Sequence, residues 1–477
     1  MSHNNSLQPD QYRPRLLAAG LPEEAVNTWL TEMASLQIAG VSNADSLESD
    51  ARAAGTLINR GWAFCAALPP RSQRSDAERA AGDLIVRLVT TLCRDVCRVH
   101  RSTMYALLTK DFRRFIRTEE LVFEAAARWP GLLPSRAELE AESGTMQKDK
   151  DGLELNQGIF FSQLFMDPQA GIHHLHAMLR PKPESEALLD TFIEQGGIKL
   201  DYVTVEVKGK AGYVYLSNPR YLNAEDDLTS ADLETAVDLV LLHPHIDIGV
   251  LRGGPIDHPK YHGRRVFGSG VNLTKIYQGK LPYLMFLTRD IAPLNKLYYG
   301  LAGDTWNEDD PHNTLEKPWL AAVETFAIGG GCQLLLVMDY VLAEAGSYFS
   351  LPARKEGIIP GVANLRLARF VGESAAREGI LFDKQFDAES PEAAGRINRV
   401  VAPGDMDAAI EEFIGNALDS GMVSAAGNRK VLRIGQENLE LYRRYMANFA
   451  EIQAWCHLSP QLIQNLEKYW NARERKL

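Results

Sequence analysis

Hydrophobic residues in the first 195 positions recur at the spacing of amphipathic helices. The clearest apolar stripe combines Leu84, Ile85, Leu88, Val89, Leu92 and Val96. Turn-forming residues interrupt the region at Pro69-Pro70, at residues 129–131 and in the polar segment 147–152. We therefore predict that residues 1–195 form a helical N-terminal domain.

A different pattern begins near Gly196. Residues 202–217, YVTVEVKGKAGYVYLS, alternate between apolar and polar positions around a glycine-containing turn, which predicts a β-hairpin. A helix over 231–243 and a short buried strand over 246–253 follow. Because strands and helices continue to alternate to about residue 400, we predict an α/β core over residues 196–420.

The last segment, residues 421–477, returns to helical periodicity. Its apolar positions need a packing surface, and they include Leu439, Leu441, Tyr442, Tyr445 and Phe449. We expect this C-terminal helical segment to pack on a neighbouring subunit or back on its own core, and to serve oligomerisation.

Composition narrows the function classes. The chain has 45% hydrophobic and 24% charged residues, which is ordinary globular usage, and its formal charge of −11 argues against a nucleic-acid-binding protein. No apolar run of about 18 residues predicts a transmembrane helix. The first 17 residues do not resemble a signal peptide, and five sparse cysteines are typical of reduced thiols. We therefore expect a cytoplasmic protein with no membrane or nucleic-acid partner.

Two glycine-rich segments are candidates for chemistry. Residues 266–279 read VFGSGVNLTKIYQG, and residues 316–343 run from a strand-like stretch through three glycines into an apolar helix. Glycines at such corners let backbone N–H groups approach a ligand, and two corners facing one carbonyl oxygen would form an oxyanion hole. Close strand–helix packing explains the glycines equally well. Neither segment is a Walker loop or a dinucleotide-binding fingerprint.

These segments resemble the motifs of the crotonase (enoyl-CoA hydratase/isomerase) superfamily. EKPWLAAVETFAIGGGCQL is similar to its KP-x-x-AAV-x-G-x-A-x-GGG-x-E segment, and VFGSGVNL to its AF-x-AG-x-DL segment. FSLPARKEGIIPGVANLRLARFVG resembles its F-x-x-PE-x-x-x-G-x-x-P segment. The resemblance covers about residues 200–477 and implies a crotonase-type ββα superhelical core, an acyl-CoA substrate and a homo-oligomer, a trimer or a dimer of trimers.

By this resemblance, the backbone N–H groups of Val271 and Gly330 hold the thioester oxygen. Arg265 corresponds to a basic contact with the CoA phosphates, and Lys275 is a second, weaker candidate for that contact.

Two departures from the family pattern bear on the reaction. Hydratases use two carboxylates, and the corresponding residues here are Gln333 and Ala353. Neither side chain can take a proton as a carboxylate does, so simple hydration of a double bond is not expected. Arg354, Lys355 and Glu356 follow Ala353, but a surface position explains them as well.

The departures are similar to those of one branch, the cofactor-independent dioxygenases that act on 3,5-dihydroxyphenylacetyl-CoA in antibiotic biosynthesis. NPRYLNAEDD, LTRD, GGGCQ and LPARKEGIIPG resemble that branch's motifs. The resemblance implies that Glu225, Arg289 and Gln333 surround the dihydroxyphenyl ring. It also implies that Ala353 and Ile358 line an apolar O₂ pocket. Val271 stands where isoleucine is expected, which leaves the backbone donor unchanged. No metal or organic cofactor is implied, because CoA is part of the substrate.

Other interpretations remain open. The clusters His173–His174–His176 and Cys93–Cys97–His100 could bind a metal, although each lacks a suitable further ligand and buried structural roles are commoner. Alternative functions are an aryl-acyl-CoA thioesterase or isomerase of the same superfamily, and a non-catalytic scaffold with the crotonase fold.

Overall fold

The computed structural model describes residues 9–307, 310–419 and 421–475. Residues 1–8, part of the segment in which we expect no signal peptide, lie outside this range. The chain forms two compact units. The helical unit comprises Met1–His174, Ile276–Leu284 and Met446–Ile463, and the core unit comprises Leu175–Lys275, Met285–Tyr445 and Gln464–Leu477. None of the helices in the described ranges is long and apolar enough to cross a membrane.

The helical unit is built around α4, Asp76–Thr109. All six residues of the predicted apolar stripe are buried on this helix, so that prediction is confirmed. Helix α4 packs on α3, Ala44–Ala67, where Gly61 leaves room for Val89: a Cβ at Gly61 would lie 2.3 Å from Val89 Cγ1. The other α-helices that begin before residue 175 are α1 (Pro9–Ala18), α2 (Glu23–Ser35), α5 (Thr118–Arg128), α6 (Arg136–Glu142), α7 (Leu155–Met166) and α8 (Pro168–Leu179).

A seven-stranded sheet in the order β1-β2-β3-β4-β7-β9-β12 forms the centre of the core unit. Strands β1 to β3 are antiparallel, and β3, β4, β7, β9 and β12 are parallel. The strands are β1 (Gly197–Lys199), β2 (Val203–Lys208), β3 (Ala211–Leu216), β4 (Ile248–Gly253), β7 (Trp319–Val323), β9 (Tyr340–Glu344) and β12 (Arg399–Val401). The predicted hairpin is confirmed, with Lys208 opposite Ala211.

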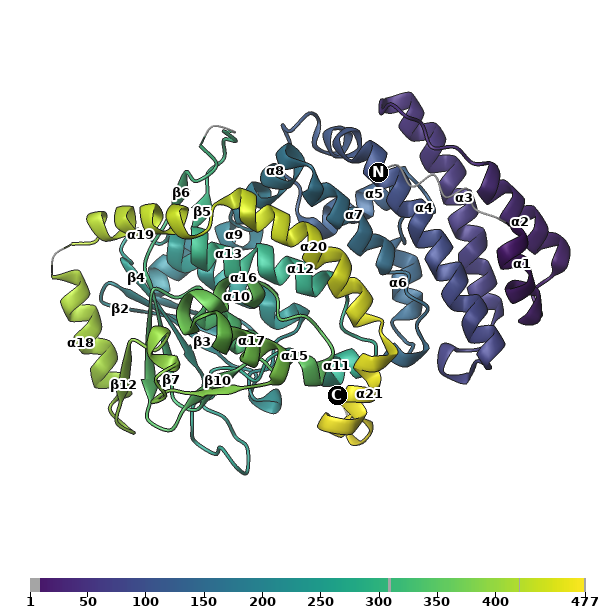
Figure 1. The fold of residues 1–477 in the computed structure, drawn as a ribbon. Helices are drawn as coiled ribbons and strands as arrows, with labels where there is room; N and C mark the ends of the chain where they lie inside the picture. Colours follow the sequence, from purple (N-terminus) through teal and green to yellow (C-terminus); the bar gives the residue numbers. More distant parts are fainter. Residues whose placement is uncertain (1–8, 308–309, 420, 476–477) are drawn as a thin grey trace. The chain divides into compact units, whose positions relative to one another are not determined.

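Helices cover both faces of this sheet. Ala211 and Tyr213 of β3 pack with Met406 and Ile410 of α18, Met406–Leu418, which lies beside the sheet in Figure 1. A side chain at the intervening Gly212 would lie on the other face, because side chains alternate along a strand. A Cβ there would be 2.8 Å from Val240 of α10, Asp227–Leu242. The predicted α/β core therefore has its sheet between helices.

Smaller elements accompany this sheet. A three-stranded sheet combines β8 (Phe326–Ile328), β10 (Tyr348–Ser350) and β11 (Gln385–Asp387), and a short pair combines β5 (Leu301–Ala302) and β6 (Thr314–Leu315). The remaining α-helices up to residue 382 are α9 (Pro183–Gln195), α11 (Leu273–Tyr277), α12 (Leu284–Ile291), α13 (Pro293–Tyr299), α14 (Gly330–Leu335), α15 (Ala353–Glu356), α16 (Ala363–Val371) and α17 (Glu373–Phe382).

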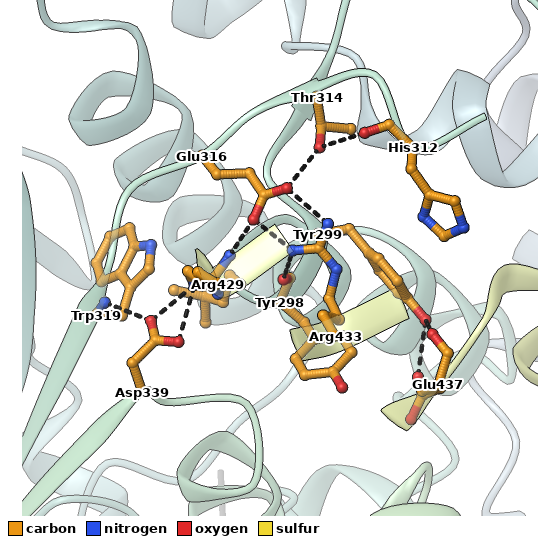
Figure 2. A network of polar contacts seen from close by, with 11 residues as sticks. Tyr298, Tyr299, His312, Thr314, Glu316, Trp319, Asp339, Arg429, Arg433 and Glu437 are labelled. Atoms are coloured by element: carbon orange, nitrogen blue, oxygen red, sulfur yellow. Dashed lines mark hydrogen bonds and ion pairs between the residues drawn. The ribbon is translucent and has the colours of Figure 1, made fainter. Parts of the chain in front are cut away.

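The C-terminal segment is helical, as predicted, and comprises α19 (Val423–Gln436), α20 (Leu439–His457) and α21 (Pro460–Trp470). A buried polar network anchors α19 to the core unit (Figure 2). Glu316 lies between Arg429 and Arg433, Arg429 also pairs with Asp339, and the Tyr299 hydroxyl donates to Glu437. Leu439 and Tyr442 are buried within the chain, so these apolar positions of the tail are covered without a second subunit.

Candidate active site

The two glycine-rich segments lie side by side in the core unit. The Ile328 N–H donates to the Gly268 carbonyl at 2.9 Å, and Gly268 pairs with Ala327 in a parallel bridge. A Cβ at Gly331 would lie 3.0 Å from the Gly268 carbonyl oxygen. The glycines therefore do permit close backbone packing, and the same packing brings both candidate donor positions to one place.

The candidate oxyanion-hole donors belong to neighbouring turns. Gly330 is the first residue of α14, so its N–H has no acceptor within that helix. Gly270, which precedes Val271, has φ +86°, and a Cβ there would lie 3.6 Å from the Gly330 nitrogen. Within the described ranges, neither the Val271 N–H nor the Gly330 N–H donates to a backbone carbonyl. Both groups are therefore available for a ligand oxygen.

Glu225 is held next to these turns by its own backbone. Its N–H donates to the Gly270 carbonyl, and its carbonyl accepts from the Asn272 N–H, each at 2.7 Å. The next residue, Asp226, caps α10 by accepting from the Thr229 N–H. Local sequence thus begins a helix directly after Asp226, and pairing with the glycine-rich segment aligns Glu225 beside Val271.

Arg289 joins the predicted polar residues into one buried cluster. Its Nε donates to Glu225 Oε2, and its Nη2 donates to Glu225 Oε1 at 3.1 Å and to the Gly330 carbonyl at 2.9 Å. Its Nη1 donates to Gln333 Oε1 at 2.5 Å and to Asp290 Oδ1 at 3.2 Å. A guanidinium has five N–H groups, and all five are used here. Arg289 is therefore placed to orient Glu225 and Gln333, with no N–H left for a substrate hydroxyl.

The electrostatics of the cluster keep the arginine charged. Burial disfavours the charged guanidinium, but the carboxylates of Glu225 and Asp290 outweigh this penalty and raise the pKa of Arg289. Burial raises the pKa of Asp290 to about 6, against the opposing effect of Arg289 and Arg366. Burial also raises the pKa of the Cys332 thiol beside the glycines, which keeps it neutral and unsuited to act as a thiolate nucleophile.

Two glycines make room for the two carboxyl groups. A Cβ at Gly330 would lie 2.2 Å from Glu225 Oε2, and a Cβ at Gly361 would lie 1.9 Å from Asp290 Oδ2. Real Cβ atoms do not occupy such distances, so a side chain at either position would displace the carboxyl group or the turn.

Residues 351–361, which contain the predicted O₂ pocket, are tied to this cluster at both ends. The Gly329 N–H donates to the Ser350 carbonyl at 2.8 Å, and Gly361 contacts the Asp290 carboxyl group. Within the segment, the Ile358 N–H donates to the Ala353 carbonyl at 3.3 Å. The structure thus brings Ala353 and Ile358 together next to the glycine-rich turn.

The residues after Ala353 differ in their burial. Arg354 is exposed and pairs with Asp383. Glu356 is buried, so the surface interpretation fails for this residue. Burial, together with the Asp383 carboxylate, raises the pKa of Glu356 to about 7.

The two candidate CoA contacts have different surroundings. Arg265 lies over the Tyr215 ring and lines an open cavity of about 530 Å³. Its Nη1 donates to the Gly253 carbonyl at 3.2 Å, and its charge acts on the carboxylates of Glu324 and Asp407. Lys275 instead pairs with Asp226 at 3.0 Å and with Asp227 at 3.3 Å. Burial disfavours its ammonium, but these carboxylates outweigh the penalty and raise the pKa of Lys275.

The histidine cluster is hydrogen-bonded to protein groups. His173 Nδ1 contacts the Tyr105 hydroxyl at 2.7 Å, His174 Nε2 contacts Thr118 Oγ1 at 3.2 Å, and His176 Nε2 contacts the Gly303 carbonyl at 3.2 Å. These contacts favour the structural interpretation.

The cysteine cluster also has a structural explanation. Cys93 and Cys97 are free thiols with sulfur atoms 4.0 Å apart, and His100 contacts Asp50. Among the residues that the structure describes, no group of three His, Cys, Asp or Glu side chains is arranged to hold a metal ion.

Sequence inspection did not single out Asp290 and Gly361, although both lie inside motifs that it used. Asp290 ends LTRD, and Gly361 ends LPARKEGIIPG. A buried acid directly after a buried arginine is a usable signal, but the contact between Asp290 and Gly361 joins positions that are 71 residues apart.

Comparison with known proteins assigns the chain to a family. The family model described as enoyl-CoA hydratase/isomerase matches residues 207–420. The (3,5-dihydroxyphenyl)acetyl-CoA 1,2-dioxygenase of Amycolatopsis orientalis is 42% identical over 407 residues, which are 85% of this chain and 92% of the relative. "Probable enoyl-CoA hydratase" of Rhizobium meliloti (strain 1021) is 30% identical over 214 residues, which are 45% of this chain and 72% of the relative.

A crystal structure of an enoyl-CoA hydratase from Mycobacterium avium subsp. paratuberculosis K-10 aligns with 56% of this chain and 98% of its own, at 19% identity and a TM-score of 0.47. The family match covers the strands of the core unit from β3 onward, and the 42% identical relative extends the match into the helical unit. The predicted crotonase-type α/β fold, with its helical N-terminal region and C-terminal tail, is thereby confirmed. The chain belongs to the enoyl-CoA hydratase/isomerase family, the crotonases.

Proposed function

We propose that this protein is a dioxygenase that converts 3,5-dihydroxyphenylacetyl-CoA and O₂ to 3,5-dihydroxyphenylglyoxylate and CoA. The observation that carries the proposal is the Arg289 cluster, which sets Glu225 and Gln333 beside the candidate oxyanion hole. In place of the two hydratase carboxylates, the site has an amide at Gln333 and a methyl group at Ala353. The relative from Amycolatopsis orientalis, whose name states this substrate and reaction, supports the choice of reaction.

The first step in this proposal is loss of one benzylic α-proton. The N–H groups of Val271 and Gly330 would hold the resulting enolate oxygen, and the aryl ring spreads its charge. Glu225 and Gln333 would bind the ring hydroxyls, and Arg265 would contact the CoA phosphates. Lys275 remains a weaker candidate for that contact, because Asp226 and Asp227 already neutralise it.

Oxygen then reacts with the enolate. One electron passes to O₂, and the two radicals combine into an α-peroxide. The distal peroxide oxygen attacks the thioester carbonyl, and the CoA thiolate leaves. Cleavage of the O–O bond with loss of the second α-proton gives the ketone and the carboxylate, each with one oxygen atom from O₂. Ala353 and Ile358 would supply the apolar wall that keeps water from the carbanion.

The test of this proposal follows O₂ uptake and thiol release together. Chelator-treated protein that is depleted of metal should consume one O₂ per CoA released, at the rate of untreated protein, because the substrate itself supplies the electrons. A thioesterase would release CoA without O₂ uptake, an isomerase would release no CoA, and a scaffold would do neither. Activity that disappears on chelation and returns with Fe(II) would contradict the metal-free reaction.

Gln333 and Glu225 are expected to act by hydrogen bonding and not by covalent chemistry. Gln333→Ala and Glu225→Gln should each lower kcat/KM by about 10- to 150-fold, because a hydrogen bond to a charged group contributes about 1.5–3 kcal/mol. Gln385→Ala, which changes an exposed glutamine on β11, is the matched control and should keep full activity. Full activity of either site variant at limiting and saturating substrate would refute the assignment.

We also propose that the protein is a homo-oligomer, a trimer or a dimer of trimers. Exposed apolar side chains on α19, Val423, Val431 and Leu432, support an interface there. Light scattering that gives a monodisperse monomer would exclude it.

A further inference from the structure

Asp290 is a buried carboxyl group that the proposed chemistry does not use. Its side chain is directly beside the cluster, because Oδ1 accepts from Arg289 Nη1 at 3.2 Å, and the residue is 2% exposed. In the described part of the chain, Oδ2 is buried and has no hydrogen-bond partner. It lies instead against the Cα of Gly361. A buried oxygen without a partner is unfavourable, so a carboxyl group kept there calls for an explanation.

The position of Asp290 is set from both sides. The Tyr442 hydroxyl donates to the Asp290 carbonyl at 2.9 Å, which fixes the backbone at the end of α12. On the other side, only a glycine at position 361 leaves space for the carboxyl group. The carboxyl group is thus confined where it meets Nη1 of Arg289, the same nitrogen that donates to Gln333.

We propose that Asp290 is a positioning residue: its carboxylate holds Arg289 in the plane that directs Glu225 and Gln333 toward the hydroxyl groups of the substrate ring. Because the Gln333 carbonyl oxygen accepts from Arg289, its NH₂ group remains to donate to a ring oxygen. This inference rests on the proposed function, since it assigns the orienting contact behind the two ring-binding side chains.

Protonation of Asp290 would weaken this arrangement. Burial raises the pKa of Asp290 to about 6, so the carboxylate is present above that pH and is lost as the pH falls through it. The charged and titratable groups that face it are Arg289 on the same helix, Arg366 on α16, Glu225 before α10, and Tyr442 and Tyr445 on α20.

Binding measurements without O₂ show how Asp290 affects recognition of the ring hydroxyl groups, because no turnover takes place. Titration calorimetry compares the binding of 3,5-dihydroxyphenylacetyl-CoA with that of phenylacetyl-CoA. The dissociation constant of phenylacetyl-CoA divided by that of 3,5-dihydroxyphenylacetyl-CoA is a ratio that reports recognition of the hydroxyl groups. Asp290→Asn, which keeps an acceptor but removes the charge, should lower this ratio about 5- to 10-fold at pH 7.5. Its ratio should not change between pH 7.5 and 5.5, whereas that of the unmodified protein should fall. Gly361→Ala, whose Cβ would displace the carboxyl group, should lower the ratio as well.

The control is Gln385→Ala, an exposed change on β11 that leaves Arg289, Asp290 and the contacts that position them untouched. Its ratio should remain that of the unmodified protein. A purely structural role of Asp290 would weaken both ligands equally, and this result, or an unchanged ratio in Asp290→Asn, would overturn the proposal. Absence of O₂ uptake by the unmodified protein would refute the proposed function alone, provided that hydroxyl-selective binding still depends on Asp290.

Discussion

Gly330→Ala should lower kcat by about 100- to 1,000-fold, the size of effect expected when an oxyanion-hole donor is lost. The added Cβ would lie 2.2 Å from Glu225 Oε2, an atom that Arg289 Nε already holds. Either the carboxylate must leave the arginine or the turn that carries the Gly330 N–H must move. In both cases the donor and the ring-binding side chains lose their common geometry.

Steady-state kinetics with 3,5-dihydroxyphenylacetyl-CoA would measure this effect. Gly415→Ala is a matched control, because Gly415 lies in α18 with open space around its Cα. That change should leave the activity unaltered and slightly favour the helix. Circular dichroism should show that both variants are folded. A Gly330→Ala protein with ordinary kcat would show that the close contact with Glu225 does not matter for turnover.

The largest effect on stability is expected at the network in Figure 2. Glu316→Ala should lower the free energy of unfolding by about 3–5 kcal/mol, because it leaves buried arginine charges without their shared carboxylate. Arg433 would keep the Tyr298 carbonyl, and Arg429 would keep Asp339 and the Leu297 carbonyl. The loss of stability should therefore be greatest in α19 around Arg433.

Urea unfolding gives the change in stability, and hydrogen exchange over residues 423–436 gives its location. Glu373→Ala removes a carboxylate from an exposed pair with Arg377, and it should change stability by less than about 1 kcal/mol. Unchanged protection of α19 in the Glu316→Ala protein would contradict the anchoring role of the network.

Local patterns in the sequence determined the elements of this fold. The stripe on α4 and the hairpin of β2 and β3 involve neighbours a few residues apart, so helical or alternating spacing is enough to predict them. The glycine-rich turns were also visible, because glycine is needed where backbones touch. The family motifs then indicated which of these turns carry the candidate oxyanion hole.

Only the tertiary structure decided which polar groups meet. Glu225 and Gln333 are 108 positions apart, and both meet Arg289 because folding brings three separate segments of the chain together. Sequence inspection placed Arg289 at the substrate ring, but its five N–H groups are all taken by the protein. It likewise left Lys275 open to a phosphate, whereas Asp226 and Asp227 neutralise it.

The physical reason for this division is the range of the interactions. Secondary structure depends on spacing along the chain, which the sequence states directly. A hydrogen-bond partner, the burial that shifts the pKa of Asp290, and the space that Gly361 leaves for its carboxyl group depend on segments brought together by folding. The sequence by itself therefore determined the elements, the glycine turns and the candidate side chains of this crotonase, and the tertiary structure decided which of these side chains meet Arg289 and Asp290.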